Sequence, residues 1–144
     1  MSAETFFSDT QKEAIRKAIE TAEGKTSGEI RVHIDRVCKD DVVKTAEKTF
    51  GKLKMNNTVE RNGVLFYLAV DSKVFAIYGD KGIHEKVPEG FWNSTSAEME
   101  KHFRNGNFTE GLVAGIEKAG EQMANYFPFQ QGDKNELTND ISFK

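Results

Sequence analysis

The chain has little of several features that would narrow its function at once. Its 144 residues include one cysteine, Cys38, which excludes an intramolecular disulfide and a cysteine-rich zinc site. Two prolines, at positions 88 and 128, leave long stretches free to form regular elements. The longest apolar run, residues 64–70, is far shorter than the ~20 residues that a membrane-spanning helix needs. We therefore expect no membrane span.

The sequence also lacks a strong charge of either sign. Twenty basic and 23 acidic residues give a net charge of −3, which disfavours binding to nucleic acid. Residues 1–10 show neither the basic nor the apolar region of a signal peptide, so we expect a soluble, cytoplasmic protein. A chain of this length forms a single domain, and it can bury enough surface to fold without a metal.

Hydrophobic periodicity predicts helices and strands that alternate along the chain. Helices are expected over 9–23 after an N-cap at Ser8, over 41–54, from Ser94 or Ser96 to 105, and over 108–126. Strands are expected over 29–35, 64–70 and 73–78, with a short edge strand or a docked terminus at 141–143; residues 79–92 are interpreted as a loop. This order predicts an α/β fold with helices on both faces of a small mixed sheet, in which residues 64–70 form a central strand.

Few residues point to nucleophilic catalysis or to a zinc site. Cys38 has no histidine beside it in the sequence, and no Gly-x-Ser-x-Gly motif occurs. His33, His84 and His102 lack the spacing of a zinc-binding helix, and His33 is interpreted as part of a wet or partly covered strand face with Glu29 and Arg31. Residues 79–82, Gly-Asp-Lys-Gly, lack the spacing of a phosphate-binding loop and are interpreted as a turn.

Oxygen-bearing side chains gather in two loops that flank the predicted hairpin of residues 64–70 and 73–78. The start of one antiparallel strand lies beside the end of the next, so residues 56–62 and 79–85 should meet at one edge. Between them they offer Asn56, Asn57, Glu60, Asn62, Asp80 and Glu85. Ca²⁺ and Mg²⁺ prefer such oxygen ligands, although solvated polar loops have the same composition.

Several segments, in their order and spacing, resemble the TPM domain family. They are residues 27–30 (Ser-Gly-Glu-Ile), 61–65 (Arg-Asn-Gly-Val-Leu), 79–83 (Gly-Asp-Lys-Gly-Ile) and 103–108 (Phe-Arg-Asn-Gly-Asn-Phe). The family is named after a thylakoid-lumen acid phosphatase, a photosystem II repair protein and a modulator of a nematode acetylcholine receptor. The resemblance covers about residues 8–128 and leaves 129–144 as a polar tail.

The resemblance implies a three-layer α/β/α sandwich on a roughly four-stranded sheet. It also implies that two crossing loops hold divalent cations, usually calcium, with room for up to two ions. Carried over by position, the metal ligands would be Asp80, Asn62 and Glu60, with Asn57 and Glu85 as weaker candidates.

The chain departs from the family pattern at the predicted site. Arg61 stands where the family has an acidic residue, and Lys81 lies within the segment where the family has Gly-Tyr-Gly. A lysine beside a cation weakens the site unless it points away. In the tail, Asp133, Asn135 and Glu136 are further candidate ligands.

Three functions follow as hypotheses. The first is a regulatory or interaction module that binds Ca²⁺ or Mg²⁺, with an unidentified protein as a further partner. The alternative is a metal-assisted phosphatase, in which Asp80 or Glu60 positions a water and Lys81 or Arg61 faces the phosphate. The third is a structural adaptor that binds a protein through Trp92 and the strand face around His33.

Overall fold

The computed structural model describes residues 3–130 and 137–144. Its helices are α1 (Ala3–Phe6), α2 (Asp9–Glu23), α3 (Val42–Lys52), α4 (Lys81–Lys86), α5 (Asn93–Arg104) and α6 (Phe108–Met123). Its strands are β1 (Glu29–Asp35), β2 (Gly63–Ala69), β3 (Val74–Gly79) and β4 (Ser142–Phe143). The predicted α/β class with a small mixed sheet is therefore confirmed.

The sheet is built around β2. Its strand order is β3-β2-β1-β4, and β1 runs parallel to both β2 and β4, whereas β2 and β3 form the predicted antiparallel hairpin. Every residue of β2 is buried, as expected for a central strand that is covered on both faces. The parallel register pairs Glu29 with Gly63 at one end and Asp35 with Ala69 at the other.

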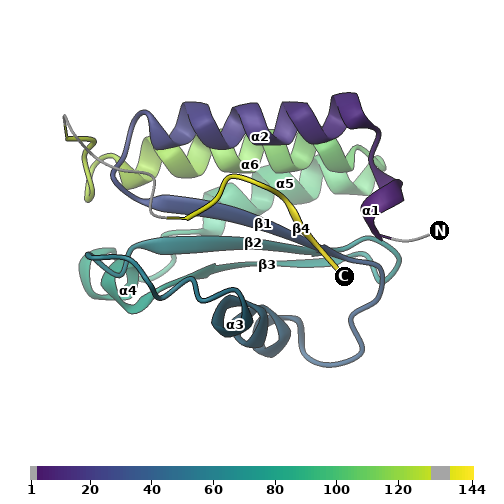
Figure 1. The fold of residues 1–144 in the computed structure, drawn as a ribbon, viewed down its shortest axis with the longest axis horizontal. Helices are drawn as coiled ribbons and strands as arrows, with labels where there is room; N and C mark the ends of the chain where they lie inside the picture. Colours follow the sequence, from purple (N-terminus) through teal and green to yellow (C-terminus); the bar gives the residue numbers. More distant parts are fainter. Residues whose placement is uncertain (1–2, 131–136) are drawn as a thin grey trace.

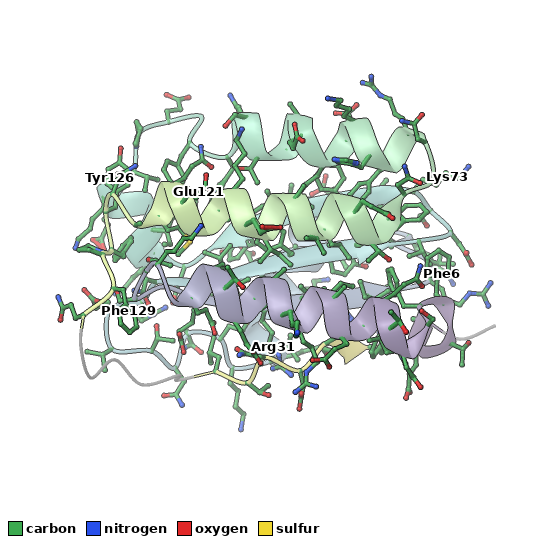
Figure 2. The ribbon with its side chains drawn as sticks, turned by 90° about the horizontal axis from the view of Figure 1, so that it is seen from above. Phe6, Arg31, Lys73, Glu121, Tyr126 and Phe129 are labelled. Atoms are coloured by element: carbon green, nitrogen blue, oxygen red, sulfur yellow. The ribbon has the colours of Figure 1, made fainter. Side chains whose placement is uncertain are left out.

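Helices cover both faces of the sheet and make three layers (Figure 1). Helices α2, α5 and α6 lie over one face, and α2 and α6 pack side by side, as Figure 2 shows from above. This face holds the larger core, in which α2 and α6 bury their apolar stripes against alternate residues of two strands. The strand residues of this core are Ile30, Val32, Ile34, Val64, Phe66 and Leu68.

The opposite face carries a smaller core under α3. Phe50 of α3 and Met55 just after it pack against Leu65 and Tyr67, which point to this side of β2. Helix α3 lies against β2 and β3, and the polar residues of β1 occupy the rest of this face beside the C-terminal segment (Figure 1). The two faces of β1 therefore have different coverings.

Several local predictions agree closely with the structure. The helix over 9–23 and the strand over 29–35 have the predicted bounds. Ser8 caps α2 in a capping box with Gln11, in which each side chain accepts from the other's backbone N–H. The predicted edge strand at 141–143 pairs with β1 as β4. No helix in the described ranges is long and apolar enough to cross a membrane.

Other predictions were wrong or lie outside the described residues. The expected loop over 79–92 contains α4, which Asp80 caps, and α5 begins at Asn93 without a serine side-chain cap. The polar face of β1, expected to be wet or partly covered, is largely buried, since Glu29 is 4% and His33 6% exposed. The candidate ligands of the tail, residues 133, 135 and 136, lie outside the described residues.

The packing of α2 on α6 depends on a glycine. A Cβ atom added at Gly120 would lie 2.7 Å from Cβ and 2.8 Å from Cα of Ala22, so the two helix backbones approach too closely for any side chain. We predict that Gly120→Ala lowers the free energy of unfolding by about 1–3 kcal/mol, because the helices must move apart. Urea unfolding measures the change.

Gly51→Ala in α3 is the matched control, because a Cβ there meets nothing within 4 Å. The same glycine-to-alanine change should raise the free energy of unfolding by about 0.5 kcal/mol through helix propensity. Equal effects of the two substitutions would contradict the close helix contact.

Glu23 at the end of α2 is a buried carboxyl group that joins this helix to the sheet. Its Oε2 accepts from the backbone N–H of Ile30 at 2.9 Å. Burial raises the pKa of Glu23 from 4.5 to about 8, with a smaller contribution from the nearby carboxylate of Glu29. The folded chain therefore holds a proton there that the unfolded chain has lost at neutral pH.

We predict that this proton makes the protein less stable as the pH rises. Because the folded pKa lies above the unfolded one, the stabilisation is complete below pH 4.5 and is lost as the pH rises through about 8. The slope is at most about 1.4 kcal/mol per pH unit. Glu23→Gln keeps the acceptor for Ile30, so its advantage over the parent in urea unfolding should grow from pH 5 to pH 8. Glu117→Gln, at an exposed position of α6 that does not influence Glu23, should show no such growth.

Candidate functional site

The β2–β3 hairpin brings together the two segments in which ligands were predicted. Residues 57–62 lead into β2 and residues 80–85 follow β3; together they are called the crossing segments. The backbone N–H of Asp80 donates to the carbonyl of Gly63, and that of Gly82 donates to the carbonyl of Arg61, both at 2.9 Å. A Cβ at Gly82 would lie 2.2 Å from the carbonyl oxygen of Glu60, so only glycine fits this crossing. The predicted meeting of the two segments is thus present in the structure.

Asp80 lies at the centre of the crossing and is 5% exposed. Its Oδ1 accepts from the backbone N–H of Lys81 at 2.7 Å, which caps α4. The guanidinium of Arg61 binds both oxygens, Nε to Oδ2 at 2.7 Å and Nη2 to Oδ1 at 2.9 Å. This hydrogen-bonded pair raises the pKa of Arg61. Asp80 is therefore already neutralised by a cationic group of the chain itself.

Asn62 and Glu60 lie in the same crossing segment and meet a serine from the entry to β1. The side chain of Asn62 is buried, and its Nδ2 donates to Ser27 Oγ at 3.4 Å. Ser27 Oγ in turn donates to Glu60 Oε2 at 3.0 Å. Asn62 Oδ1 is buried without a hydrogen-bond partner among the described residues. The cluster of Ser27, Glu60 and Asn62 is therefore rich in oxygen, and one of its acceptors is unused.

Asn57 and Glu85 do not join this cluster. Both are exposed, Asn57 in the turn before β2 and Glu85 on α4. In the described part of the chain, no hydrogen bond or ion pair connects either side chain to Asp80, Glu60 or Asn62. The structure thus separates the five predicted ligands into three that lie at the crossing and two at its margin.

Ser27 was absent from the predicted ligands, although residues 27–30 were part of the resemblance. Its hydroxyl reaches the site because the parallel register places the start of β1 beside the start of β2, where the backbone N–H of Glu29 donates to the carbonyl of Asn62. That parallel pairing could not be deduced from the hairpin, which involves β2 and β3 alone. A hydroxyl directly before a strand was the signal available in the sequence.

The described residues hold no group of three or more histidine, cysteine, aspartate or glutamate side chains placed to bind a metal ion. The cluster of Ser27, Glu60 and Asn62 instead combines one carboxylate with an amide and a hydroxyl, next to a second carboxylate held by arginine. Such a mixture suits a hard cation and gives no soft ligand for zinc or copper.

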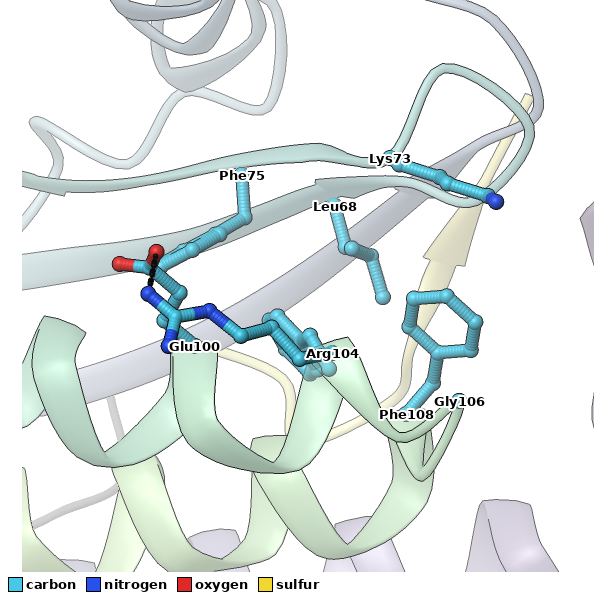
Figure 3. Close-up of a pocket in the computed structure, with 8 residues that line it drawn as sticks. Leu68, Lys73, Phe75, Glu100, Arg104, Gly106 and Phe108 are labelled. Carbon is cyan, nitrogen blue, oxygen red and sulfur yellow. Dashed lines mark hydrogen bonds and ion pairs between the residues drawn. The ribbon is translucent and has the colours of Figure 1, made fainter.

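A cavity of about 540 Å³ lies at the other end of the hairpin (Figure 3). Phe75, Phe103 and Phe108 form most of its wall, and the ring centroids of Phe75 and Phe103 lie 5.1 Å apart. At its edge Arg104 forms an ion pair with Glu100 at 2.7 Å. These apolar walls suit an apolar group, and the cavity adds no ligand to the crossing segments.

Comparison with known proteins places the chain in a family. The model of the TPM domain matches residues 1–122. The NMR structure of the BA42 protein from the psychrophilic bacterium Bizionia argentinensis is 48% identical, with a TM-score of 0.93 over 98% of this chain and 97% of that one. A search of curated proteins found no match.

Two more distant solution structures share the fold. The N-terminal domain of a protein from P. gingivalis is 20% identical, with a TM-score of 0.70 over 85% of this chain and 80% of that one. The N-terminal domain of the cg2496 protein from Corynebacterium glutamicum is 13% identical, with a TM-score of 0.66 over 82% and 74%. Since the family model covers most of the sequence, the chain belongs to the TPM domain family.

Proposed function

We propose that the chain is a regulatory or interaction module that binds a divalent cation, Ca²⁺ or Mg²⁺, where the crossing segments meet. The proposed ligands are the carboxylate of Glu60, the amide oxygen of Asn62 and the hydroxyl of Ser27. The proposal is supported by the position of these oxygens and by the resemblance of the sequence to a family that binds such ions.

The single observation that carries the proposal is the unused oxygen of Asn62. A buried amide oxygen without a partner costs free energy, on the order of 1–3 kcal/mol, because it has lost its hydrogen bonds to water. Asn62 Oδ1 is such an atom, and it belongs to the side chain that also contacts Ser27. A cation at this oxygen would supply the missing interaction.

Asp80 would join the site only after a rearrangement. Arg61 occupies both of its oxygens, so an ion that binds Asp80 must displace the guanidinium. We therefore assign Glu60, Asn62 and Ser27 to a first ion, and Asp80 to a second ion that competes with Arg61. A bound ion would tie the entry of β1 to the crossing segments and stabilise the folded state.

The proposal stops short of phosphatase activity. Arg61 is directed at Asp80, and the one hydroxyl of the cluster, that of Ser27, donates to Glu60, which is assigned to the cation. The metal-assisted phosphatase thus has no specific observation in its favour. A protein partner remains an untested prediction.

We predict that Ca²⁺ shifts the amide resonances of residues 27, 60–62 and 80–82 and raises the Tm by several degrees. At a concentration one hundred times the Kd, a bound ligand adds about 2.7 kcal/mol of stability. Glu60→Gln should weaken binding at least tenfold, because it removes the carboxylate that attracts the ion. Titration of the EDTA-treated protein with CaCl₂ and with MgCl₂, followed by ¹⁵N–¹H spectra, measures both affinities.

Glu85→Gln is the matched control, since it removes the same charge from an exposed side chain outside the cluster. This variant should bind Ca²⁺ within about twofold of the parent. Unchanged spectra in the parent protein, or equal losses of affinity in the two variants, would overturn the proposal.

We predict that Arg61→Asn strengthens binding about tenfold, because it frees both oxygens of Asp80 for the ion. Arg61 has a positive φ of 51°, a conformation that asparagine tolerates. Arg36→Asn removes the same charge from an ion pair with Asp71 at the far end of the sheet and is the control for long-range charge. An equal gain in both variants would show that Asp80 is not a ligand; calorimetric Ca²⁺ titration decides between the two results.

A further inference from the structure

The polar face of β1 holds a second group of reactive side chains, far from the crossing segments. His33 and Asp35 point to the face that α3 leaves open, and they are 6% and 8% exposed. Strand β4 closes this side of the sheet, pairing Ser142 with His33 and Phe143 with Ile34. The group lies at the carboxyl ends of the parallel strands β1 and β2, which is where α/β sheets commonly bind ligands.

Hydrogen bonds connect four side chains here into one chain. Ser142 Oγ lies 2.9 Å from His33 Nδ1, and His33 Nε2 lies 2.7 Å from Asp35 Oδ1. The hydroxyl of Tyr67 donates to Asp35 Oδ2. The imidazole also stacks on the Tyr67 ring, with centroids 5.8 Å apart and planes inclined by 14°. Both oxygens of Asp35 are thus engaged, and the ring of His33 is held in one orientation.

The partners of Asp35 decide where the protons lie. Burial opposes ionisation of this carboxyl group, but the hydrogen bonds from His33 and Tyr67 outweigh it and lower the pKa of Asp35. Burial also raises the pKa of Tyr67, which therefore stays a donor. A carboxylate can only accept, so neutral His33 carries its proton on Nε2. Its Nδ1 is then a lone pair that accepts from the hydroxyl of Ser142.

These hydrogen-bonded side chains lie beside a pocket of about 460 Å³ between α3 and β4. Ser142, His33 and Asp35 lie in its wall, together with three lysines and one further carboxylate. These charged residues are Lys48, Lys52, Lys144 and Asp40. The charge of Lys144 acts on Asp35, whereas Lys48 and Lys52 form no ion pair with a described residue, so these two give the pocket positive charge for a ligand.

We propose that Ser142 is a nucleophile, that His33 is its general base, and that this pocket hydrolyses carboxylic esters that carry an additional negative charge. Asp35 and Tyr67 are positioning residues that hold the imidazole and its tautomer. Lys48 and Lys52 attract the anionic part of the ester. This activity uses none of the residues assigned to the cation, so it is independent of the proposed function above.

The reaction proceeds in two steps, acylation of Ser142 and hydrolysis of the acyl-serine. Ser142 Oγ bonds to the ester carbonyl carbon while its proton passes to His33 Nδ1, and Asp35 stabilises the imidazolium. The C–O bond to the alcohol then breaks, and His33 returns the proton to the departing oxygen, which leaves an acyl-serine. Water attacks this acyl group in the same way, releasing the acid and restoring Ser142 and neutral His33.

Labelling of the serine tests the proposal without a known substrate. The full chain is treated with a fluorophosphonate probe, and peptide mass spectrometry locates the adduct. One adduct on Ser142 is expected, and its rate should fall at least a hundredfold in His33→Gln, in line with the loss of a general base. The absence of an adduct on Ser142 in the parent protein would overturn the proposal, and no variant needs to fold for that result.

One further variant, Asp35→Asn, separates catalysis from a structural role of the same hydrogen bonds. If Ser142 and His33 only fasten β4, Asp35→Asn should alter stability but leave the pH dependence of labelling unchanged. As a positioning residue it should instead shift that pH profile, while amide spectra of β4 report whether the strand stays docked. If the pH profile of labelling is unshifted in Asp35→Asn while β4 stays docked, the positioning role of Asp35 is wrong.

The proposed preference for anionic esters is tested by comparing the hydrolysis of an anionic and a neutral ester. Hydrolysis of 4-nitrophenyl hemisuccinate, an anionic ester, should exceed that of neutral 4-nitrophenyl acetate in kcat/KM. Lys48→Gln combined with Lys52→Gln should reduce this preference about tenfold, chiefly through KM. Lys17→Gln, an exposed lysine of α2 on the opposite face of the sheet, should leave it unchanged. Equal rates for the two esters in the parent would contradict the proposed substrate class.

Discussion

The burial of β2 on both faces is the constraint on which the rest of the structure depends. Its residues pack against α2 and α6 on one side and against α3 on the other, so a slip of its register by one residue would exchange the side chains of its two faces and disrupt the packing of both cores. That register decides what meets at each end of the strand. Gly63 pairs with Glu29 and the next residue, Val64, pairs with Gly79 at one end, whereas Tyr67 pairs with His33 towards the other.

The buried carboxylates at the two ends of β2, Asp80 and Asp35, are stabilised in different ways. At the crossing segments, Asp80 is neutralised by Arg61, whose guanidinium occupies the oxygens that a metal would otherwise use. Because the guanidinium of Arg61 neutralises the carboxylate of Asp80, a metal ion must compete with Arg61 to bind Asp80. At the other end no arginine among the described residues pairs with Asp35, whose two oxygens bind His33 and Tyr67 while the charge of Lys144 also favours its ionised form.

Much of the fold follows from local patterns in the sequence. The alternation over 29–35, the apolar run into β2 and the cap at Ser8 each have a nearby cause, and each was predicted with nearly correct bounds. The helix α4 was missed because six residues that include Gly82 give little helical periodicity. Its cap, Asp80, was predicted as a metal ligand or as a residue that positions a water, although one carboxylate can serve as an N-cap in addition.

The polar face of β1 could not be predicted, because its covering comes from more than a hundred residues away. The alternation of apolar and polar residues over 29–35 indicated a strand with one face in the core and the other in contact with solvent or only partly covered. Here the C-terminal segment covers it: the backbone N–H of Leu137 donates to Glu29 Oε1, and Ser142 reaches His33. Burying such groups is costly unless each has a partner, so the segment that covers them must supply polar atoms at matching positions. A polar strand face beneath a polar covering is therefore a feature that only the tertiary structure reveals. The covering segment also places Ser142 against His33, the histidine that Asp35 orients.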